Sequence, residues 1–206
     1  MLHLEAVQPG TLGLLKSLMN DPYLKDFNLV GGTALALHIG HRISEDIDLF
    51  TSNAYDLLPL KDHIQKKYSA DVYAETSIGL RCYIQKIKTD FLNYPYPPIE
   101  DAVSIEGIRL LQLPDIACMK LSAIHNRGAK RDFYDLYFLL QQFNLRELTK
   151  LYLKKYKMSD PFSLYRSLTY FDDAENDLDP VLIGESKLKW EQVKKSIEKK
   201  IHNEVR

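Results

Sequence analysis

Two short stretches, Leu29–Thr33 (LVGGT) and Asp46–Phe50 (DIDLF), decide how this chain folds. In the second stretch acids alternate with apolar residues, as in a strand that is buried on one face. On such a strand Asp46 and Asp48 project together while Ile47 points into a core. Two carboxylates held side by side repel each other unless a positive charge lies between them. The pair therefore predicts a divalent metal ion.

The glycines of the first stretch lie between a predicted strand, Phe27–Val30, and a predicted helix, Ala34–Ile39. At such a junction the backbone N–H groups of Gly31 and Gly32, with the positive end of the helix, can receive a phosphate group. Thr33 could add its hydroxyl to this site, or it could be the N-cap of the helix. Together with the acids, the turn predicts metal-dependent chemistry on a nucleotide.

A third acid, Asp90, lies in the predicted strand Ile87–Leu92. Three acids converging from two strands can hold two Mg²⁺ ions about 4 Å apart, the arrangement used for in-line displacement at phosphorus. Asp90 could then take the proton of the attacking hydroxyl. Without a metal, Asp46 and Asp48 would be a solvated strand end and Asp90 an edge charge or salt bridge.

Arg42 and Ser44, just before the acids, could also contact phosphates. The alternative for Arg42 is an ion pair with Glu45 or Asp46. We predict the remaining elements from apolar periodicity. They are the helices Thr11–Met19, Tyr55–Tyr68, Asp115–Asn126, Lys130–Phe143 and Lys187–Ile201, the strands Asp71–Thr76 and Leu80–Lys86, which form a hairpin, and an exposed acidic loop at Asp172–Asp177.

This order of elements predicts the α/β (α+β) class, with a small mixed sheet flanked by helices in residues 1–113 and an α-helical lobe in residues 114–206. No flexible linker separates the two parts, so we expect one compact unit with two lobes. The net charge of −1 provides no global attraction to nucleic acid or to a membrane. Two distant cysteines, no signal peptide and no long apolar run predict a cytoplasmic, globular protein.

Four segments, in order, resemble a known family. The first two are the glycine turn and the acid pair, which look like the active-site motif of the nucleotidyltransferase superfold. The others are Asp115–Lys120 and Arg127–Tyr137, which are similar to the two downstream motifs of the AbiEii/AbiGii toxins. The matched segments run from about Leu29 to Leu140. The chain is thus identified as a member of this family, the toxin halves of type IV toxin–antitoxin and phage-abortive systems.

The resemblance implies roles for particular residues. Gly31, Gly32 and Thr33 would hold the triphosphate, and Asp46 and Asp48 would bind metal. The downstream lysine of the family falls on Lys120, and its motif of basic residues and aspartates falls on Lys130, Arg131, Asp132 and Asp135. These cations could neutralise the β- and γ-phosphates, and either aspartate could orient a cation or act as a base. The alternative is a cluster of ordinary i,i+3 pairs at the start of a helix.

The leading hypothesis is a nucleotidyltransferase that moves a nucleoside monophosphate from an NTP to a hydroxyl of tRNA or protein, and that has a cognate antitoxin. The alternative is a catalytically silent module of the same fold that binds nucleotide or a partner protein. The lysines of Lys187–Ile201 could meet a tRNA backbone, although this pattern is typical of a solvated face. Most of the 13 tyrosines should be core residues, and one could stack on a base.

Overall fold

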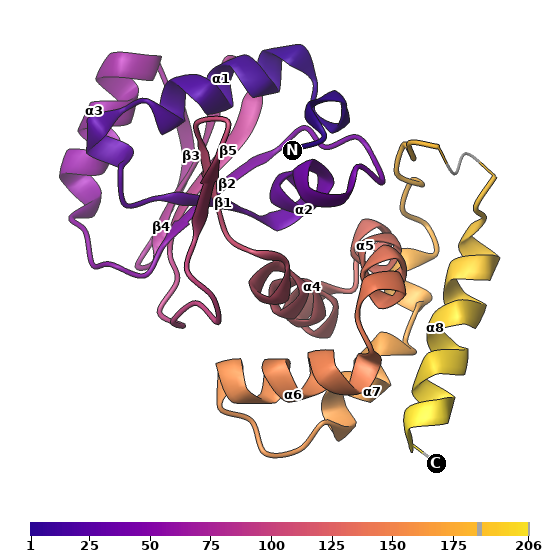
Figure 1. Cartoon of the computed structure of the whole chain (residues 1–206). Helices are drawn as coiled ribbons and strands as arrows, with labels where there is room; N and C mark the ends of the chain where they lie inside the picture. Colours follow the sequence, from indigo (N-terminus) through magenta and orange to yellow (C-terminus); the bar gives the residue numbers. More distant parts are fainter. Residues whose placement is uncertain (185–186, 206) are drawn as a thin grey trace. The chain divides into compact units, whose positions relative to one another are not determined.

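The structure is a computed structural model that describes residues 1–184 and 187–205. The chain divides into two compact units, Met1–Gln112 and the residues from Leu113 onward (Figure 1). The first unit is a seven-stranded mixed sheet with helices, and the described part of the second is built from helices and contains none of the seven strands. The predicted α/β class, with helices after the sheet, is confirmed.

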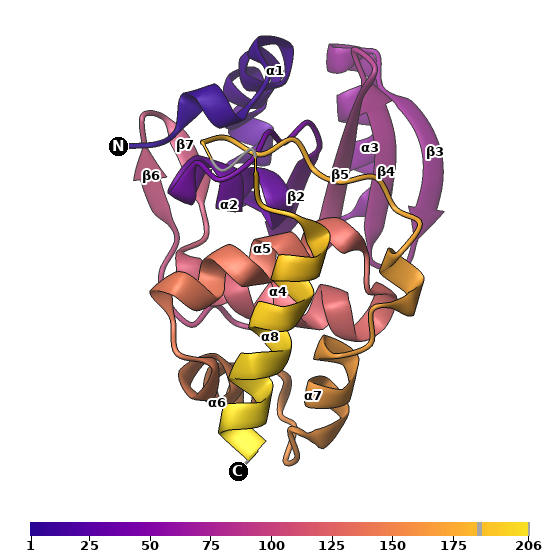
Figure 2. The same ribbon diagram turned by 90° about the vertical axis from the view of Figure 1, so that its right-hand side faces the viewer.

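The strands of the sheet lie in the order β3-β4-β5-β2-β1-β7-β6, with β3 and β6 at the two edges (Figure 2). Neighbouring strands are parallel in the pairs β2–β5 and β1–β7 and antiparallel in the others. The strands are β1 (Asn28–Val30), β2 (Ile47–Thr51), β3 (Asp71–Thr76), β4 (Gly79–Ile84), β5 (Ile87–Asn93), β6 (Val103–Ile105) and β7 (Ile108–Leu110).

The helices of the first unit are α1 (Pro9–Met19), α2 (Gly31–Ile39) and α3 (Leu57–Tyr68), with short 3₁₀ turns η1 (Leu4–Ala6) and η2 (Pro22–Leu24). In Figure 1, α3 lies beside the strands at the left and α1 runs across the top of the first unit. Leu60 and Ile64 of α3 are buried, and α3 packs on β3 and β4. Leu15, Leu18 and Met19 of α1 are also buried, so the predicted apolar faces of both helices are used in packing.

The first unit differs from the prediction most clearly at three places. Helix α2 begins at Gly31 rather than at Ala34. Strand β4 ends at Ile84, because Gln85 and Lys86 both have positive φ and form the two-residue turn that leads into β5. The β6–β7 hairpin was not predicted; its strands have three residues each, and its turn is Glu106-Gly107, again with two positive φ angles.

The helices of the second unit are α4 (Leu113–Arg127), α5 (Lys130–Gln142), α6 (Leu145–Tyr156), α7 (Phe162–Leu168) and α8 (Trp190–Val205), with a 3₁₀ turn η3 (Asp172–Ala174). The rings of Phe133 and Phe171 lie 5.7 and 5.6 Å from that of Trp190 and form part of the core. Helix α8 begins three residues after the predicted start. No helix in the described ranges is long and apolar enough to cross a membrane.

The acidic segment 172–177 is exposed at every residue except Ala174, as predicted, and it also supports a neighbouring helix. Ala174 within it is buried, and the carboxylate of Asp177 accepts a hydrogen bond from the backbone N–H of Lys130 at 3.0 Å. The segment therefore supports the start of α5, where the first N–H groups of a helix have no partner in the helix itself.

Candidate active site

The sheet places two of the predicted acids side by side. Strands β2 and β5 are parallel neighbours, and their register pairs Asp48 with Asp90. Paired residues of adjacent strands point to the same face, and the strands lie about 4.8 Å apart. On the opposite face Ile47 and Leu49 are fully buried, as predicted. The core thus fixes which face of the sheet carries the two carboxylates.

Asp90 is a buried acid whose charge is only partly compensated. Its Oδ2 lies 3.4 Å from Nε of the half-exposed Arg81, while its buried Oδ1 has no hydrogen-bond partner among the described residues. Burial raises the pKa of Asp90, and the charge of Asp46 adds to this, while Lys88 and Arg81 oppose it. A carboxyl with a raised pKa is suited to accept a proton, and its unused oxygen is free to receive a donor or a cation.

The glycine turn lies directly against Asp48. Gly31 has φ +70°, and a Cβ added there would come within 2.1 Å of Oδ2 of Asp48. Only glycine therefore allows the first turn of α2 to approach this carboxylate. Because the N-terminus of a helix presents unpaired N–H groups and partial positive charge, an anion is favoured at this place.

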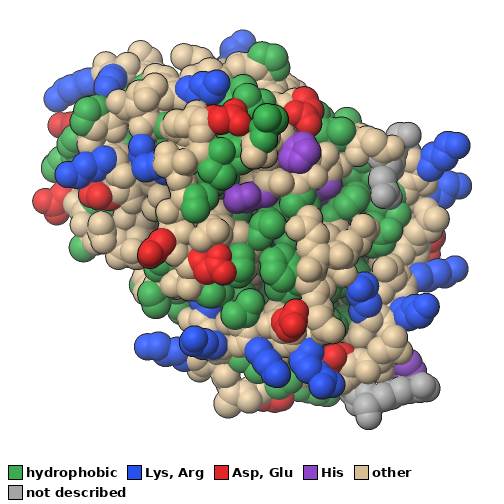
Figure 3. All heavy atoms as spheres, in the orientation of Figure 1, with side chains coloured by type: hydrophobic (Ala, Val, Ile, Leu, Met, Phe, Trp, Pro, Cys, Tyr) green, Lys and Arg blue, Asp and Glu red, His purple; other side chains and the backbone are tan. Residues whose placement is uncertain are grey.

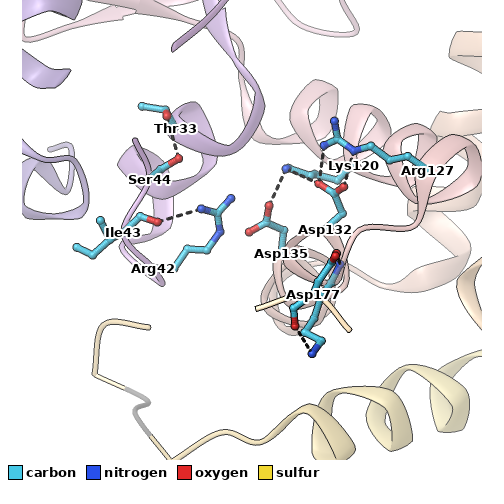
Figure 4. A network of polar contacts seen from close by, with 10 residues as sticks. Thr33, Arg42, Ile43, Ser44, Lys120, Arg127, Asp132, Asp135 and Asp177 are labelled. Carbon is cyan, nitrogen blue, oxygen red and sulfur yellow. Dashed lines mark hydrogen bonds and ion pairs between the residues drawn. The ribbon is translucent and has the colours of Figure 1, made fainter. Parts of the chain in front are cut away.

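Arg42 and Ser44 lie beside the second glycine. A Cβ on Gly32 would meet Nη2 of Arg42 at 2.5 Å and Oγ of Ser44 at 3.4 Å. The Arg42 side chain is buried, and its Nη1 donates to the carbonyl of Ile43 at 3.0 Å (Figure 4). The guanidinium is thus held at the glycine turn, where both residues were predicted to contact phosphates.

Thr33 is not the N-cap of α2. The N-cap residue is Val30, and Thr33 is buried in the first turn, where its hydroxyl lies 2.9 Å from Oγ of Ser44 and can also donate to the carbonyl of Asp46. These bonds tie the helix start to the segment that leads into β2, as Figure 4 shows for Ser44. Thr33 therefore fixes the distance between the glycine turn and the acids.

The structure does not gather the three acids into a closed metal cage. Among the described residues, no group of three or more His, Cys, Asp or Glu side chains is placed so that it could hold a metal ion. Asp46 directly precedes β2 instead of lying in it. Even so, carboxylate oxygens are the ligands that Mg²⁺ prefers, and the unpaired Oδ1 of Asp90 beside Asp48 fits a cation.

The second unit holds three of the other predicted residues, Lys120, Asp132 and Asp135, in a buried ionic network (Figure 4). Nζ of Lys120 lies 2.9 Å from Asp132 and 2.6 Å from Asp135, and all three side chains are buried. Arg127 donates to Asp132 from Nε at 2.9 Å and from Nη2 at 3.2 Å. The network joins α4 to α5, so it is not the cluster of i,i+3 pairs that was the alternative.

The two basic residues at the start of α5 differ in their surroundings. Nζ of Lys130 donates to the carbonyls of Glu175 and Asp177 and lies 5.5 Å from the centre of the Trp190 ring. These contacts fix the segment after η3 against α5. Arg131, in contrast, is exposed.

Sequence reasoning assigned no role to Arg81 or to Arg109. Arg81 pairs with Asp90 across the β4–β5 ladder, and its only sequence signal was a charge at an outward position of a predicted strand. Arg109 donates to the carbonyls of Phe27, Met19 and Leu24 at 3.2, 2.6 and 3.0 Å. It therefore holds the entry to β1, and no local pattern indicates this because the partners are more than 80 residues away.

Only part of the basic surface predicted near the C-terminus is available to contact a nucleic acid. Figure 3 shows Lys and Arg side chains over α6 and α8. The predicted buried stripe of α8 is formed by Trp190, Val193, Ile197 and Ile201. Lys194 pairs with Glu175 and Glu191, and Lys200 donates to the carbonyl of Leu140. These two lysines help to pack the second unit.

Comparison with solved structures defines the class of protein. The chain is similar to JHP933 from Helicobacter pylori (TM-score 0.56, 22% identity, 96% of this chain and 92% of that chain). It is also similar to MenT4, a nucleotidyltransferase toxin from Mycobacterium tuberculosis H37Rv (TM-score 0.56, 15% identity, 85% and 74%). At these identities the likeness concerns the fold, which is that of a nucleotidyltransferase.

The sequence comparison then gives the family. The model of the family described as "Nucleotidyl transferase AbiEii toxin, Type IV TA system" matches residues 13–203. A relative, the uncharacterized protein aq_aa25 of Aquifex aeolicus (strain VF5), is 37% identical over 186 residues, and the match covers 85% of this chain and 86% of the relative. The chain belongs to the AbiEii nucleotidyl transferase toxin family, and it is a nucleotidyltransferase, as the sequence motifs predicted.

Proposed function

We propose that this protein transfers a nucleoside monophosphate from an NTP to a hydroxyl group of an acceptor in a reaction that requires Mg²⁺. The observation that carries the proposal is the pairing of Asp48 with Asp90 beside the close approach of Gly31. An acid pair next to an anion-binding helix start is suited to a substrate that carries both a reacting phosphorus atom and a leaving pyrophosphate.

The proposed reaction is a single displacement at the α-phosphorus of the NTP. The oxygen of the acceptor hydroxyl forms a bond to this phosphorus, the bond to the bridging oxygen of the β-phosphate breaks, and pyrophosphate leaves with the electron pair. Asp90 takes the proton of the hydroxyl as the general base. The N–H groups at Gly31 and Gly32, together with Arg42, hold the triphosphate and stabilise the charge that develops on it.

We propose that two Mg²⁺ ions would be held by Asp46, Asp48 and Asp90. When bound, the metal would act as a Lewis acid on the phosphate oxygens. The chain's own contribution is the arrangement of these acids. Thr33 and Ser44 keep the glycine turn in register with the segment before β2, so that the oxygens of Asp48 remain beside the helix start.

In the second unit, we propose that Lys120 supplies positive charge to the β- and γ-phosphates and that Asp132 and Asp135 orient its ammonium. Arg131 is the exposed cation of this motif, and we propose it for phosphate contact in preference to Lys130, whose ammonium bonds backbone carbonyls. These assignments follow the family motif and the contacts within the second unit.

Membership of the toxin family supports growth arrest as the outcome of transfer, a cognate antitoxin as a partner, and a place in a type IV toxin–antitoxin or abortive infection system. We propose tRNA or protein as the acceptor and the cytoplasm, where NTPs and Mg²⁺ are present, as the compartment.

The test is the transfer of label from each α-³²P NTP to total tRNA and to a protein lysate, by wild type, Asp48→Asn and Asp101→Asn. Asp101 is exposed and is not one of the predicted site residues, so its variant is a matched control for loss of a carboxylate. We expect labelling by wild type and Asp101→Asn only, its loss with EDTA and its return with Mg²⁺. Full transfer by a folded Asp48→Asn protein, or transfer in EDTA, would contradict the proposal. Binding of Mg²⁺–NTP without any transfer would favour the silent binding module.

A further inference from the structure

Two exposed tyrosines lie together on strands β3 and β4. The side chains of Tyr73 and Tyr83 are among the exposed large hydrophobic groups, at 46% and 44%, and their ring centres are 5.1 Å apart with an interplanar angle of 35°. Core packing does not account for a pair of rings that leaves nearly half of its surface in solvent. The pair is a preformed aromatic surface at the edge of the sheet.

Strand register places this surface on the face that carries the acids. Arg81 is paired with Asp90, and Asp90 is paired with Asp48. Tyr83 is two residues after Arg81 on the same strand, so it points to the same face. The opposite face of β4 is formed by Leu80, Cys82 and Ile84, which are buried.

A β-bulge brings Tyr73 onto this face as well. The register of β3 against β4 shifts between Val72, which is paired with Cys82, and Ala74, which is paired with Arg81. The extra residue is Tyr73, and its ring reaches that of Tyr83. Bulges often lie next to active sites, where they redirect a side chain. Asp90 is also one of the charges that raise the pKa of Tyr73, after burial, so the ring is within electrostatic reach of that acid.

The tyrosines and the glycine turn lie on opposite sides of the acid pair. Gly31 follows β1, which is the neighbour of β2 on one side, whereas β5, β4 and β3 follow on the other. In an in-line displacement the attacking oxygen and the leaving group lie on opposite sides of the phosphorus atom. If the pyrophosphate leaves at the glycine turn, the acceptor must approach across β5 and β4.

From this arrangement we propose that Tyr73 and Tyr83 form a stacking platform that docks a single-stranded RNA segment of the acceptor, with Arg81 contacting its backbone. The inference rests on the proposed function and narrows its acceptor from tRNA or protein to RNA. The two strand spacings from β2 to β4, and the third to β3, put the platform roughly 10–15 Å from Asp48. The platform positions the acceptor and takes no part in bond making.

The chemistry of the platform favours RNA over a protein acceptor. Every base offers a flat face to an aromatic ring, whatever the sequence, and the phosphate between two bases offers two oxygens to a guanidinium. The Arg81 side chain is 48% exposed, and Lys88 is paired with Tyr83 across the ladder. Two rings with two cations on one face of a sheet form a surface suited to stacked bases and their phosphates.

The experiment compares wild type with Tyr73→Ala/Tyr83→Ala, with Tyr73→Phe/Tyr83→Phe, which keeps the rings, and with Tyr170→Ala as a control for loss of an exposed tyrosine. The readouts are the KM for total tRNA, the KM for the NTP, and kcat at saturating tRNA. Because a base stacked on a ring contributes about 1–3 kcal/mol, we expect the double alanine variant to raise the KM for tRNA about fivefold or more. The KM for the NTP and kcat should change by less than about twofold, and the other two variants should resemble wild type. An unchanged KM for tRNA would overturn the proposal, as would a rise in the KM for the NTP alone.

A binding assay separates this proposal from the proposed function. Its probe is a short fluorescent single-stranded RNA of mixed sequence with a free 3′-hydroxyl, followed by anisotropy at fixed salt. Weaker binding by the double alanine variant but not by the double phenylalanine variant supports the platform, even if no transfer is seen and the proposed function fails. Equal binding by all four proteins overturns it. Label that enters protein but never RNA also overturns it, and leaves nucleotide transfer itself intact.

Discussion

Asp90 in the first unit and Asp132 in the second are both buried carboxylates, yet their surroundings are opposite. Asp132 lies 2.9 Å from Lys120 and accepts two further bonds from Arg127. Asp90 has one half-exposed arginine at 3.4 Å and an oxygen without a hydrogen-bond partner in the described part of the chain. Burial raises the pKa of both, but Lys120 and Arg127 hold the pKa of Asp132 below its ordinary value, while that of Asp90 stays raised.

This difference in surroundings indicates different roles: Asp132 holds other groups in place, whereas Asp90 is ready to react. A buried charge that is fully paired keeps its ionisation and stabilises one arrangement of its neighbours. A buried carboxylate that lacks a partner costs free energy in the folded protein, and such a cost is usual where a substrate or a metal supplies the missing partner. We therefore expect substitutions of Asp90 to affect chemistry without loss of stability, and substitutions in the Lys120 network to affect folding as well as the proposed phosphate contact.

The largest effect should come from Asp90→Asn. The amide cannot accept the proton of the attacking hydroxyl, and loss of a general base lowers kcat by about 10²–10⁴-fold. The folded protein should be as stable as wild type or more so at neutral pH, because the uncompensated charge is gone. Label transfer and urea unfolding followed by far-UV circular dichroism measure the two quantities, with Asp101→Asn as control. Activity within about tenfold of wild type would remove Asp90 from the chemistry.

Lys120→Met should destabilise the second unit by about 3–5 kcal/mol. Methionine keeps the length of the side chain but leaves the two buried aspartates without their shared cation. Trp190, the single tryptophan, packs in the core of this unit, so its fluorescence reports unfolding there. Lys150→Met is the control, because Lys150 is exposed on α6. A loss below about 1 kcal/mol would show that the network does not hold α4 and α5 together.

The sequence was sufficient to predict those parts that depend on local pattern. The alternation in Asp46–Phe50 predicted the strand and its buried face, and the apolar periodicity after Pro114 predicted α4 and α5. That Asp48 and Asp90 lie close together could be predicted only from the general plan of the fold. Their strands are 40 residues apart in the chain, and no local sequence pattern pairs them.

What sequence reasoning missed depends on turns and on distant partners. The β6–β7 hairpin had a usable signal, since Glu106-Gly107 is a two-residue turn between short apolar runs. The turn at Gln85 and Lys86 had none, because neither residue favours positive φ. Spacing within α5 suggested i,i+3 pairs for Asp132, whereas its partners are on and at the end of α4.

The smallest effect, and the most direct test of the comparison, is the pH dependence of stability. Because the folded pKa of Asp90 is raised, its contribution to stability is full below the unfolded pKa of about 3.9 and is lost as pH rises through the folded pKa. For Asp132, whose folded pKa is lowered, the contribution is present above about 3.9 and is lost as pH falls through the folded pKa.

The free energy of unfolding of wild type, minus that of Asp90→Asn, should therefore decrease as pH rises from below 3.9 toward neutrality. The corresponding difference for Asp132→Asn should increase over the acid range. Urea unfolding across a pH series measures both differences, with circular dichroism as the signal for the whole chain and Trp190 fluorescence as the signal for the second unit. Because the substitutions are chemically identical, opposite slopes can arise only from the surroundings of the two carboxylates. Slopes of the same sign would mean that Asp90 is compensated in solution as fully as Asp132, and its assignment as the reactive acid would lose its physical basis.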